Sequence, residues 1–265
     1  MHRLHARLPK NFVLEERLER YASAIEIDPT GLRGRWAEAC WPAGAEGAYR
    51  RIVLDLGCGK GTFVAESARR EPDALIIGLD GEPVCIAYTA QRICEEGLGN
   101  AVAVPGTGAQ VASFFAHGEL DAIHLNFPTP YPRKKDAELR LTSFARLAEY
   151  RAILAPGGVL RFKTDSQPLF SYTLAQLERA GYEVTLGQSW EAPVTEYEQR
   201  LVAEGAAVLA CEAHPAHEPA ELAELSESLV DYLPDDLEGI GYVPLGMRGT
   251  VVNLRNRARN RGSRS

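Results

Sequence analysis

The sequence predicts an α/β protein built around a mostly parallel β-sheet. From Arg51 to about Cys211, short runs of aliphatic and β-branched residues alternate with stretches of helical periodicity, which is typical of repeated strand-helix-strand units. The chain has 265 residues, of which 45% are hydrophobic and 25% charged, so it can bury a sizeable core. This length fits one large domain with appendages or two modest domains.

Seven strands are expected from the apolar runs, and they cover residues 51–57, 74–80, 101–104, 120–127, 157–165, 182–190 and 205–213. Between the fourth and fifth runs, apolar residues recur at helical spacing from Leu141 until Pro156 ends the pattern. The last two runs are joined by too little periodic sequence for a parallel crossover. We therefore expect the seventh strand to be antiparallel and to lie near one edge of the sheet.

Three segments of the chain differ in character. Residues 1–50 contain one expected helix, around Leu14 to Ile25, residues 51–213 carry the alternating pattern, and residues 214–265 form an appendage. The appendage begins with an expected amphipathic helix whose apolar positions are Leu222, Leu225, Leu229 and Leu233. It ends in RNRARNRGSRS, which has five arginines and no acid and is typical of a mobile basic tail.

The composition limits the compartment and the cofactors. Five cysteines without a C-x-x-C pair indicate neither a disulfide framework nor a zinc site, and we expect no metal. There is no apolar segment of signal-peptide type at the start and no run near the roughly 20 residues of a membrane helix. We expect a cytoplasmic protein that is not bound to a membrane, and nothing in the sequence indicates an obligate protein partner.

A glycine-rich turn follows the first strand, in the sequence Asp55-Leu56-Gly57-Cys58-Gly59-Lys60-Gly61. Glycines let the backbone turn sharply and approach a ligand, and the next helix offers unpaired N–H groups. An acid, Asp80, ends the second strand some twenty residues later, where a carboxylate can accept hydrogen bonds from both ribose hydroxyls. The spacing resembles the first two motifs of class I S-adenosylmethionine-dependent methyltransferases.

The loop after the fourth strand, Pro128-Thr129-Pro130-Tyr131-Pro132-Arg133, is expected to face this cofactor, because ligands bind beyond the carboxyl ends of parallel strands. The prolines restrict the backbone, Tyr131 can stack on a base, and Arg133 can contact phosphate.

Four segments in order resemble the bacterial tRNA (guanine-N7-)-methyltransferase family over roughly residues 6–213. They are the LPKNFVLEERLERY start, the loop at 128–133, the Thr164-Asp165 pair and Thr195-Glu196-Tyr197-Glu198-Gln199-Arg200. The resemblance implies a Rossmann-like sheet of seven strands and a reaction that methylates N7 of a tRNA guanosine, in the family usually position 46 of the variable loop. It implies S-adenosylmethionine as cofactor and tRNA as partner.

The resemblance also implies roles for individual residues. Asp55, Asp80 and the glycines Gly57, Gly59 and Gly61 fall on the cofactor site. Arg133 falls on a basic substrate-binding residue, Arg140 is the remaining match to a basic run, and Asp165 with Thr195, Glu196, Tyr197 and Glu198 falls on the guanosine-binding residues.

Two family acids are replaced in this chain. Thr107 stands where an acid is expected near the adenine of the cofactor, and Thr129 stands where the family has a catalytic aspartate that also borders the cofactor. Guanine N7 has a free lone pair, so its methylation needs alignment and compensation of positive charge rather than a general base. We expect a carboxylate from Asp165, Glu198 or Asp136 to replace that of the missing aspartate, with Asp165 and Glu198 holding the guanine edge.

Two alternatives remain open. The chain can be a relative that binds cofactor or tRNA but has lost turnover, because two acids are replaced. It can also methylate an exocyclic amine, because amino-methyltransferases place a proline-aromatic motif in the same loop.

The net charge of -7 does not oppose a nucleic-acid substrate once the charges are located. Residues 212–238 contain nine acids and no Lys or Arg, so the rest of the chain has 29 basic and 27 acidic residues. We expect the acidic segment to face away from RNA or, alternatively, to cover a basic groove until RNA displaces it. The arginine tail and the N-terminal Arg3, Arg7 and Lys10 are candidates for phosphate binding.

Overall fold

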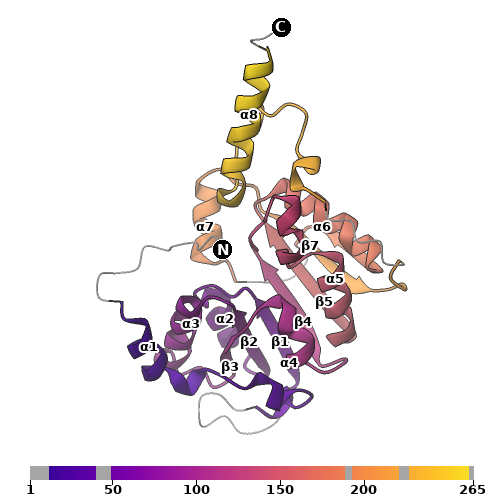
Figure 1. Cartoon of the computed structure of the whole chain (residues 1–265). Coiled ribbons are helices and arrows are strands. Elements are labelled where there is room, and N and C mark those ends of the chain that lie inside the picture. The colour runs from indigo at the N-terminus through magenta and orange to yellow at the C-terminus, as the bar shows by residue number, and fades with distance from the viewer. Residues whose placement is uncertain (1–11, 40–48, 189–192, 221–226, 263–265) are drawn as a thin grey trace.

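The computed structural model describes residues 12–39, 49–188, 193–220 and 227–262. Seven strands form one sheet in the order β3-β2-β1-β4-β5-β7-β6 (Figure 1). The strands are β1 (Arg51–Leu56), β2 (Ala74–Asp80), β3 (Ala101–Pro105), β4 (Leu120–Asn126), β5 (Leu154–Thr164), β6 (Tyr182–Leu186) and β7 (Leu209–Pro215). The first five strands are parallel, and β7 pairs antiparallel with both β5 and β6. The predicted fold class and the antiparallel strand near the edge are confirmed.

Helices cover both faces of the sheet. The α-helices are α1 (Leu14–Arg20), α2 (Thr62–Arg70), α3 (Pro83–Glu95), α4 (Val111–Phe114), α5 (Phe144–Ile153), α6 (Gln167–Arg179), α7 (Glu196–Ala203) and α8 (Arg248–Gly262). Because successive strand residues point to opposite faces, Val53 and Ile76 pack toward α2 and α3, whereas Leu54 and Ile77 lie in the core cluster beside α5 and α6. Within the described ranges, no helix combines the length and apolar character needed to cross a bilayer.

Several predicted boundaries shift. The helix expected near residues 14–25 ends at Arg20 and is followed by a short 3-10 turn, and β7 begins at Leu209 rather than at residue 205. The fifth strand starts three residues early, at Leu154, because a register irregularity lets residues before Gly157 pair with β4. Residues 189 and 190 of the expected sixth strand lie outside the described residues.

The amphipathic helix predicted near Leu229 and Leu233 is wrong for the described residues. Leu222 and Leu225 lie outside the described residues, and Leu229–Tyr232 form only a 3-10 turn, η6. Leu229 is fully buried, and its N–H donates to the Pro132 carbonyl at 3.0 Å, so this stretch is fixed by contacts with another loop. Pro234 then prevents a helical continuation.

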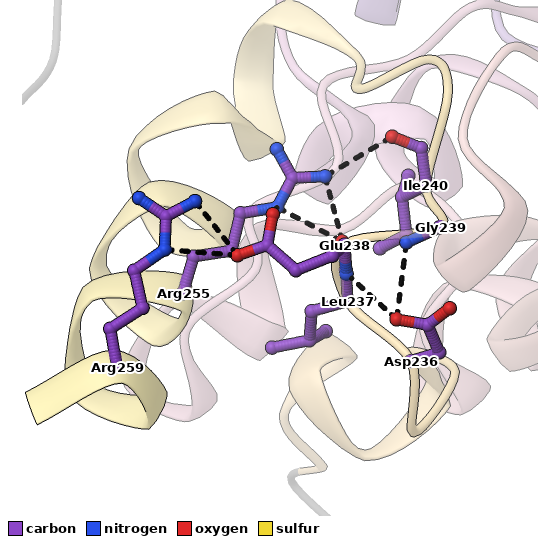
Figure 2. Close-up of polar contacts among 7 residues, drawn as sticks. All are labelled: Asp236, Leu237, Glu238, Gly239, Ile240, Arg255 and Arg259. Atoms are coloured by element: carbon purple, nitrogen blue, oxygen red, sulfur yellow. Dashed lines mark hydrogen bonds and ion pairs between the residues drawn. The ribbon is translucent and has the colours of Figure 1, made fainter. Parts of the chain in front are cut away.

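Within the described residues, the basic segment predicted to be a mobile tail lies in α8, which projects from the body of the molecule (Figure 1), and residues 263–265 of that segment lie outside the described residues. The Arg255 guanidinium anchors this helix by donating to the carbonyls of Leu237 and Ile240 (Figure 2). Glu238 lies within 2.9 Å of Arg259 and 3.8 Å of Arg255. Glu238 therefore compensates the charge of two arginines of α8, which composition by itself does not reveal.

Candidate active site at the carboxyl edge of the sheet

One face of the sheet carries a row of polar side chains at the carboxyl ends of its strands. The register pairs Asp55 of β1 with Gly78 and His124, and Asn126 of β4 with Lys163 of β5. These positions lie an even number of residues from Val53, Ala122 and Val159, which are packed together in the core cluster beneath α2 and α3. Because strand side chains alternate, Asp55, Asn126 and Lys163 share that face.

The glycine turn has the backbone that a close approach to a ligand requires. Gly57, Gly59 and Gly61 all have positive φ, at 82°, 56° and 73°. A Cβ on Gly61 would lie 2.8 Å from the Cα of Thr89 in α3, so this glycine permits the helix to pack on the turn. A Cβ on Gly59 would meet no atom within 4 Å, so the turn is open at that point.

Asp80 is tied to this turn by two backbone hydrogen bonds. The Gly59 N–H donates to Oδ2 at 2.9 Å, and the Glu82 N–H donates to Oδ1 at 2.8 Å. Each carboxylate oxygen keeps another lone pair, so the pair of oxygens fits the two hydroxyls of a ribose. Burial raises the pKa of Asp80, whereas the two backbone donors oppose that rise.

Asp55 is buried, and Asn126 Nδ2 donates to its Oδ1 at 3.0 Å. Burial raises the pKa of Asp55 to about 7, because a charged carboxylate is poorly solvated there. A cationic group beside Asp55, such as the ammonium of S-adenosylmethionine, would favour the ionised form. The donor set around this turn therefore fits that cofactor.

Thr107 lies beside the same strand ends. The Gly106 N–H donates to the Asp80 carbonyl, and a Cβ on Gly81 would lie 3.2 Å from the Thr107 methyl carbon. Gln110 Oε1 accepts from both the N–H and the hydroxyl of Thr107. Thr107 thus lies beside the end of β2, and its hydroxyl is already engaged within its own turn.

The loop after β4 is strained. Phe127 and Tyr131 have φ values of 52° and 46°, a left-handed conformation that is rare for aromatic residues and costs roughly 1–3 kcal/mol each. Thr129 is half-buried between them, and its hydroxyl makes no hydrogen bond to another described residue. Burial raises the pKa of Tyr131, and the carboxylates of Asp136, Asp80 and Glu82 raise it further.

The two arginines of this region have different surroundings. Arg133 is exposed and donates to Asp136 Oδ2 at 2.6 Å. Arg140 is fully buried, donates to the carbonyls of Pro130, Tyr131 and Glu227, and stacks on the Tyr172 ring at 4.6 Å. This burial argues against the predicted contact of Arg140 with substrate phosphate, because its guanidinium instead holds the strained loop.

Glu198 pairs with a buried lysine. Lys163 Nζ donates to Oε1 and Oε2 of Glu198 at 3.0 and 2.9 Å, and both side chains are buried. Thr195 caps α7, with its hydroxyl oxygen accepting from the Glu198 N–H at 3.2 Å. Glu196 is the first residue of α7, and its side chain lies outside the described part of the structure. The charge of Glu198 is therefore compensated within the protein, which revises its expected role at the guanine edge.

Asp165 is different, because no cation lies within ion-pair distance of it among the described residues. Its Oδ2 accepts a hydrogen bond of 2.7 Å from the Tyr242 hydroxyl. Tyr197 is close enough for the charge of Asp165 to raise its pKa, after the larger effect of burial, and its ring lies 5.4 Å from Phe127. Asp165, Tyr197 and Phe127 thus gather beside the loop.

Sequence reasoning did not single out Asn126, Lys163 or Tyr242. Asn126 and Lys163 could have been found from the sequence, because each is a polar residue near the carboxyl end of an apolar strand. Ligands bind beyond these strand ends. Tyr242 had none, because it lies 77 residues from Asp165 in a segment without any recognised motif.

A seven-stranded, mostly parallel sheet with a glycine turn after β1 and an acid at the end of β2 is the arrangement of a class I methyltransferase fold. A family model described as a putative methyltransferase matches residues 49–211. The chain is 33% identical over 206 residues to a tRNA (guanine-N(7)-)-methyltransferase from Geobacillus kaustophilus, covering 75% of this chain and 92% of the relative. Its identity to the protein of the same name from Lactococcus lactis subsp. cremoris is 34%, over 75% of this chain and 93% of the relative. The chain belongs to the tRNA (guanine-N7-)-methyltransferase family.

Among solved structures, a 16S rRNA (adenine(1408)-N(1))-methyltransferase from Catenulisporales acidiphilia has a TM-score of 0.47 at 18% identity, over 79% of this chain and 94% of that chain.

Proposed function

We propose that this protein transfers a methyl group from S-adenosylmethionine to N7 of a guanosine in tRNA, in the variable loop at position 46. The supporting observation is that, among the described residues, the Asp165 carboxylate has no cationic partner. Of the three carboxylates available to replace the family's loop aspartate, Glu198 is paired with Lys163 and Asp136 with Arg133. Among the described residues, the hydrogen-bond partner of the Asp165 side chain is the neutral Tyr242 hydroxyl, and no cation pairs with it.

The residues of the site have separate tasks in this proposal. Asp80 and the glycine turn hold the cofactor, and Asp55 faces its cationic part. When bound, the cofactor supplies an electrophilic methyl group: the N7 lone pair forms the new N–C bond while the C–S bond breaks and its electron pair remains on sulfur. Asp165 accepts hydrogen bonds from the guanine N1–H and N2–H edge and offsets the positive charge that develops on the base. Tyr197 lies beside Asp165 and offers its ring to the base.

The test is methylation of unmodified bulk tRNA with labelled cofactor, followed by borohydride and aniline cleavage, which reports N7-methylguanosine. We expect label incorporation and chain cleavage at one position. Label without cleavage would indicate an exocyclic amine as the acceptor, and cofactor binding without label would indicate a relative that has lost turnover.

The substitution Thr129→Asp tests whether a carboxylate in the loop after β4 speeds the reaction. If the family's loop aspartate compensates charge on the base, its restoration is expected to raise kcat about tenfold, since a good bidentate contact contributes roughly 1–3 kcal/mol. Thr129→Asn is the matched control, because it has similar size and hydrogen-bonding capacity without the charge. A lower kcat for Thr129→Asp than for the wild type would contradict the role given to Asp165.

A further inference from the structure

The segment 227–247 reaches the acceptor site from outside the region matched by the family model, which ends at residue 211. The Tyr242 hydroxyl donates to Asp165 Oδ2 at 2.7 Å. Burial and the neighbouring carboxylate of Asp165 raise the pKa of Tyr242, so the phenol stays protonated and remains the donor. Asp165 Oδ1 accepts no hydrogen bond from another described residue, and it is left for a ligand.

The same segment is fastened to the strained loop at two places. At its start, the Ser228 hydroxyl and the Leu229 N–H both donate to the Pro132 carbonyl, at 3.1 and 3.0 Å. Near its end, Gly246 packs so closely on the loop that a Cβ there would lie 2.8 Å from Pro130 Cδ. The segment therefore spans the loop that contains Thr129.

A cavity of about 350 Å³ lies between this segment and the beginning of α6. Asp165 and Gln167 line one side, and Ile240, Tyr242 and Val243 line the other. Its volume falls in the range of small-ligand pockets. The Asp165 carboxylate thus borders both Tyr242 and this cavity.

We propose that residues 227–247 complete the methyl acceptor site and that Tyr242 is a positioning residue, which orients the Asp165 carboxylate toward the guanine of the tRNA. This inference rests on the proposed function. The hydrogen bond fixes one oxygen of Asp165 and removes a rotational freedom that the carboxylate would otherwise lose on binding the base. The anchored segment also holds the loop in its left-handed conformations, which persist only when the surroundings determine them strongly.

The experiment compares Tyr242→Phe, which removes only the hydroxyl, with Tyr232→Phe, which removes a hydroxyl of the same segment that donates to Glu227 instead. Because a hydrogen bond to a charged group is involved, Tyr242→Phe is expected to lower kcat about tenfold. The affinity for S-adenosylhomocysteine and the melting temperature are expected to stay at wild-type values. Tyr232→Phe is expected to keep the wild-type kcat.

A double-mutant cycle shows whether the effect passes through Asp165. Tyr242→Phe is expected to have no further effect in an Asp165→Ala background. An equal loss in both backgrounds would overturn the proposal, as would a wild-type kcat for Tyr242→Phe. A gain in kcat would also overturn it, because the hydroxyl would then compete with guanine for Asp165.

A binding readout separates this inference from the proposed function. In the presence of S-adenosylhomocysteine, Tyr242→Phe is expected to weaken binding of guanosine 5′-monophosphate about tenfold and to leave binding of adenosine 5′-monophosphate unchanged. If the wild type makes no N7-methylguanosine but binds guanosine 5′-monophosphate about tenfold more tightly than Tyr242→Phe does, the proposed function fails, whereas the positioning of Asp165 toward guanine by Tyr242 stands. If the wild type methylates tRNA but Tyr242→Phe matches it both in kcat and in affinity for guanosine 5′-monophosphate, the inference fails.

Discussion

The cofactor half and the acceptor half of the site are built differently. The cofactor half, Gly57–Gly61 with Asp80, comes from consecutive strand-turn-helix units, and Asp80 accepts a hydrogen bond from the Gly59 N–H. The acceptor half joins the loop after β4, Asp165, α7 and residue 242, which are separated by tens of residues. A local motif is sufficient for the first half, whereas the second depends on long-range packing.

The largest effect is expected from the buried ion pair of the acceptor half. Lys163→Met leaves the Glu198 carboxylate buried without its cation, which costs about 3–5 kcal/mol of the free energy of unfolding. Chemical denaturation measures this loss, with the exposed Lys135→Met as the control. A loss below about 1 kcal/mol would mean that α7 is not held to β5 by this pair.

In the cofactor half, Asp80→Ala is expected to weaken S-adenosylhomocysteine binding at least about a hundredfold. The ribose would lose two hydrogen bonds to a charged acceptor, each contributing roughly 1.5–3 kcal/mol. Isothermal titration calorimetry measures the affinity. Asp73→Ala, at the other end of β2, is the control, and an equal effect of the two substitutions would remove Asp80 from the cofactor site.

The pKa of Asp55, about 7 in the folded protein, predicts a pH effect confined to the cofactor half. A cationic ligand binds the ionised carboxylate, so affinity for S-adenosylhomocysteine is expected to rise up to tenfold per pH unit below pH 7 and to level off above it. Asp55→Asn is expected to flatten this profile. Because the folded pKa is raised, the ligand-free protein should also lose stability as the pH rises from about 4 through 7, and Asp55→Asn should abolish that loss.

The smallest effect is expected at α8, beside the acceptor half. Arg257 is exposed on this helix, so Arg257→Gln is expected to lower the salt dependence of tRNA binding by a slope of roughly 0.7–0.9 if it contacts one phosphate. Arg35→Gln is the control, since the neighbouring Gly34 and Trp36 bond to Glu119 at the amino edge of the sheet. An unchanged slope for Arg257→Gln would exclude this residue from phosphate binding.

Sequence patterns predicted the parts that depend on neighbours along the chain. Strand alternation, the glycine turn and Asp80 are each encoded within a few residues, because side-chain direction and backbone freedom are local properties. The direction of β7 followed from the short connection before it. The motif match also located Asp165, although not its partners.

Only the tertiary structure decided which charges are free to act. The motif match predicts that Arg140 and Glu198 are available to a substrate, yet packing buries both. Arg140 donates to the carbonyls of Pro130 and Tyr131, and Glu198 accepts from Lys163. Five arginines without an acid predict a mobile tail, yet the Arg255 side chain donates to two carbonyls and fixes α8. The order of apolar residues along the chain determined the fold through burial of apolar surface. The pairing of each charge depended on distances that arise only when remote segments meet.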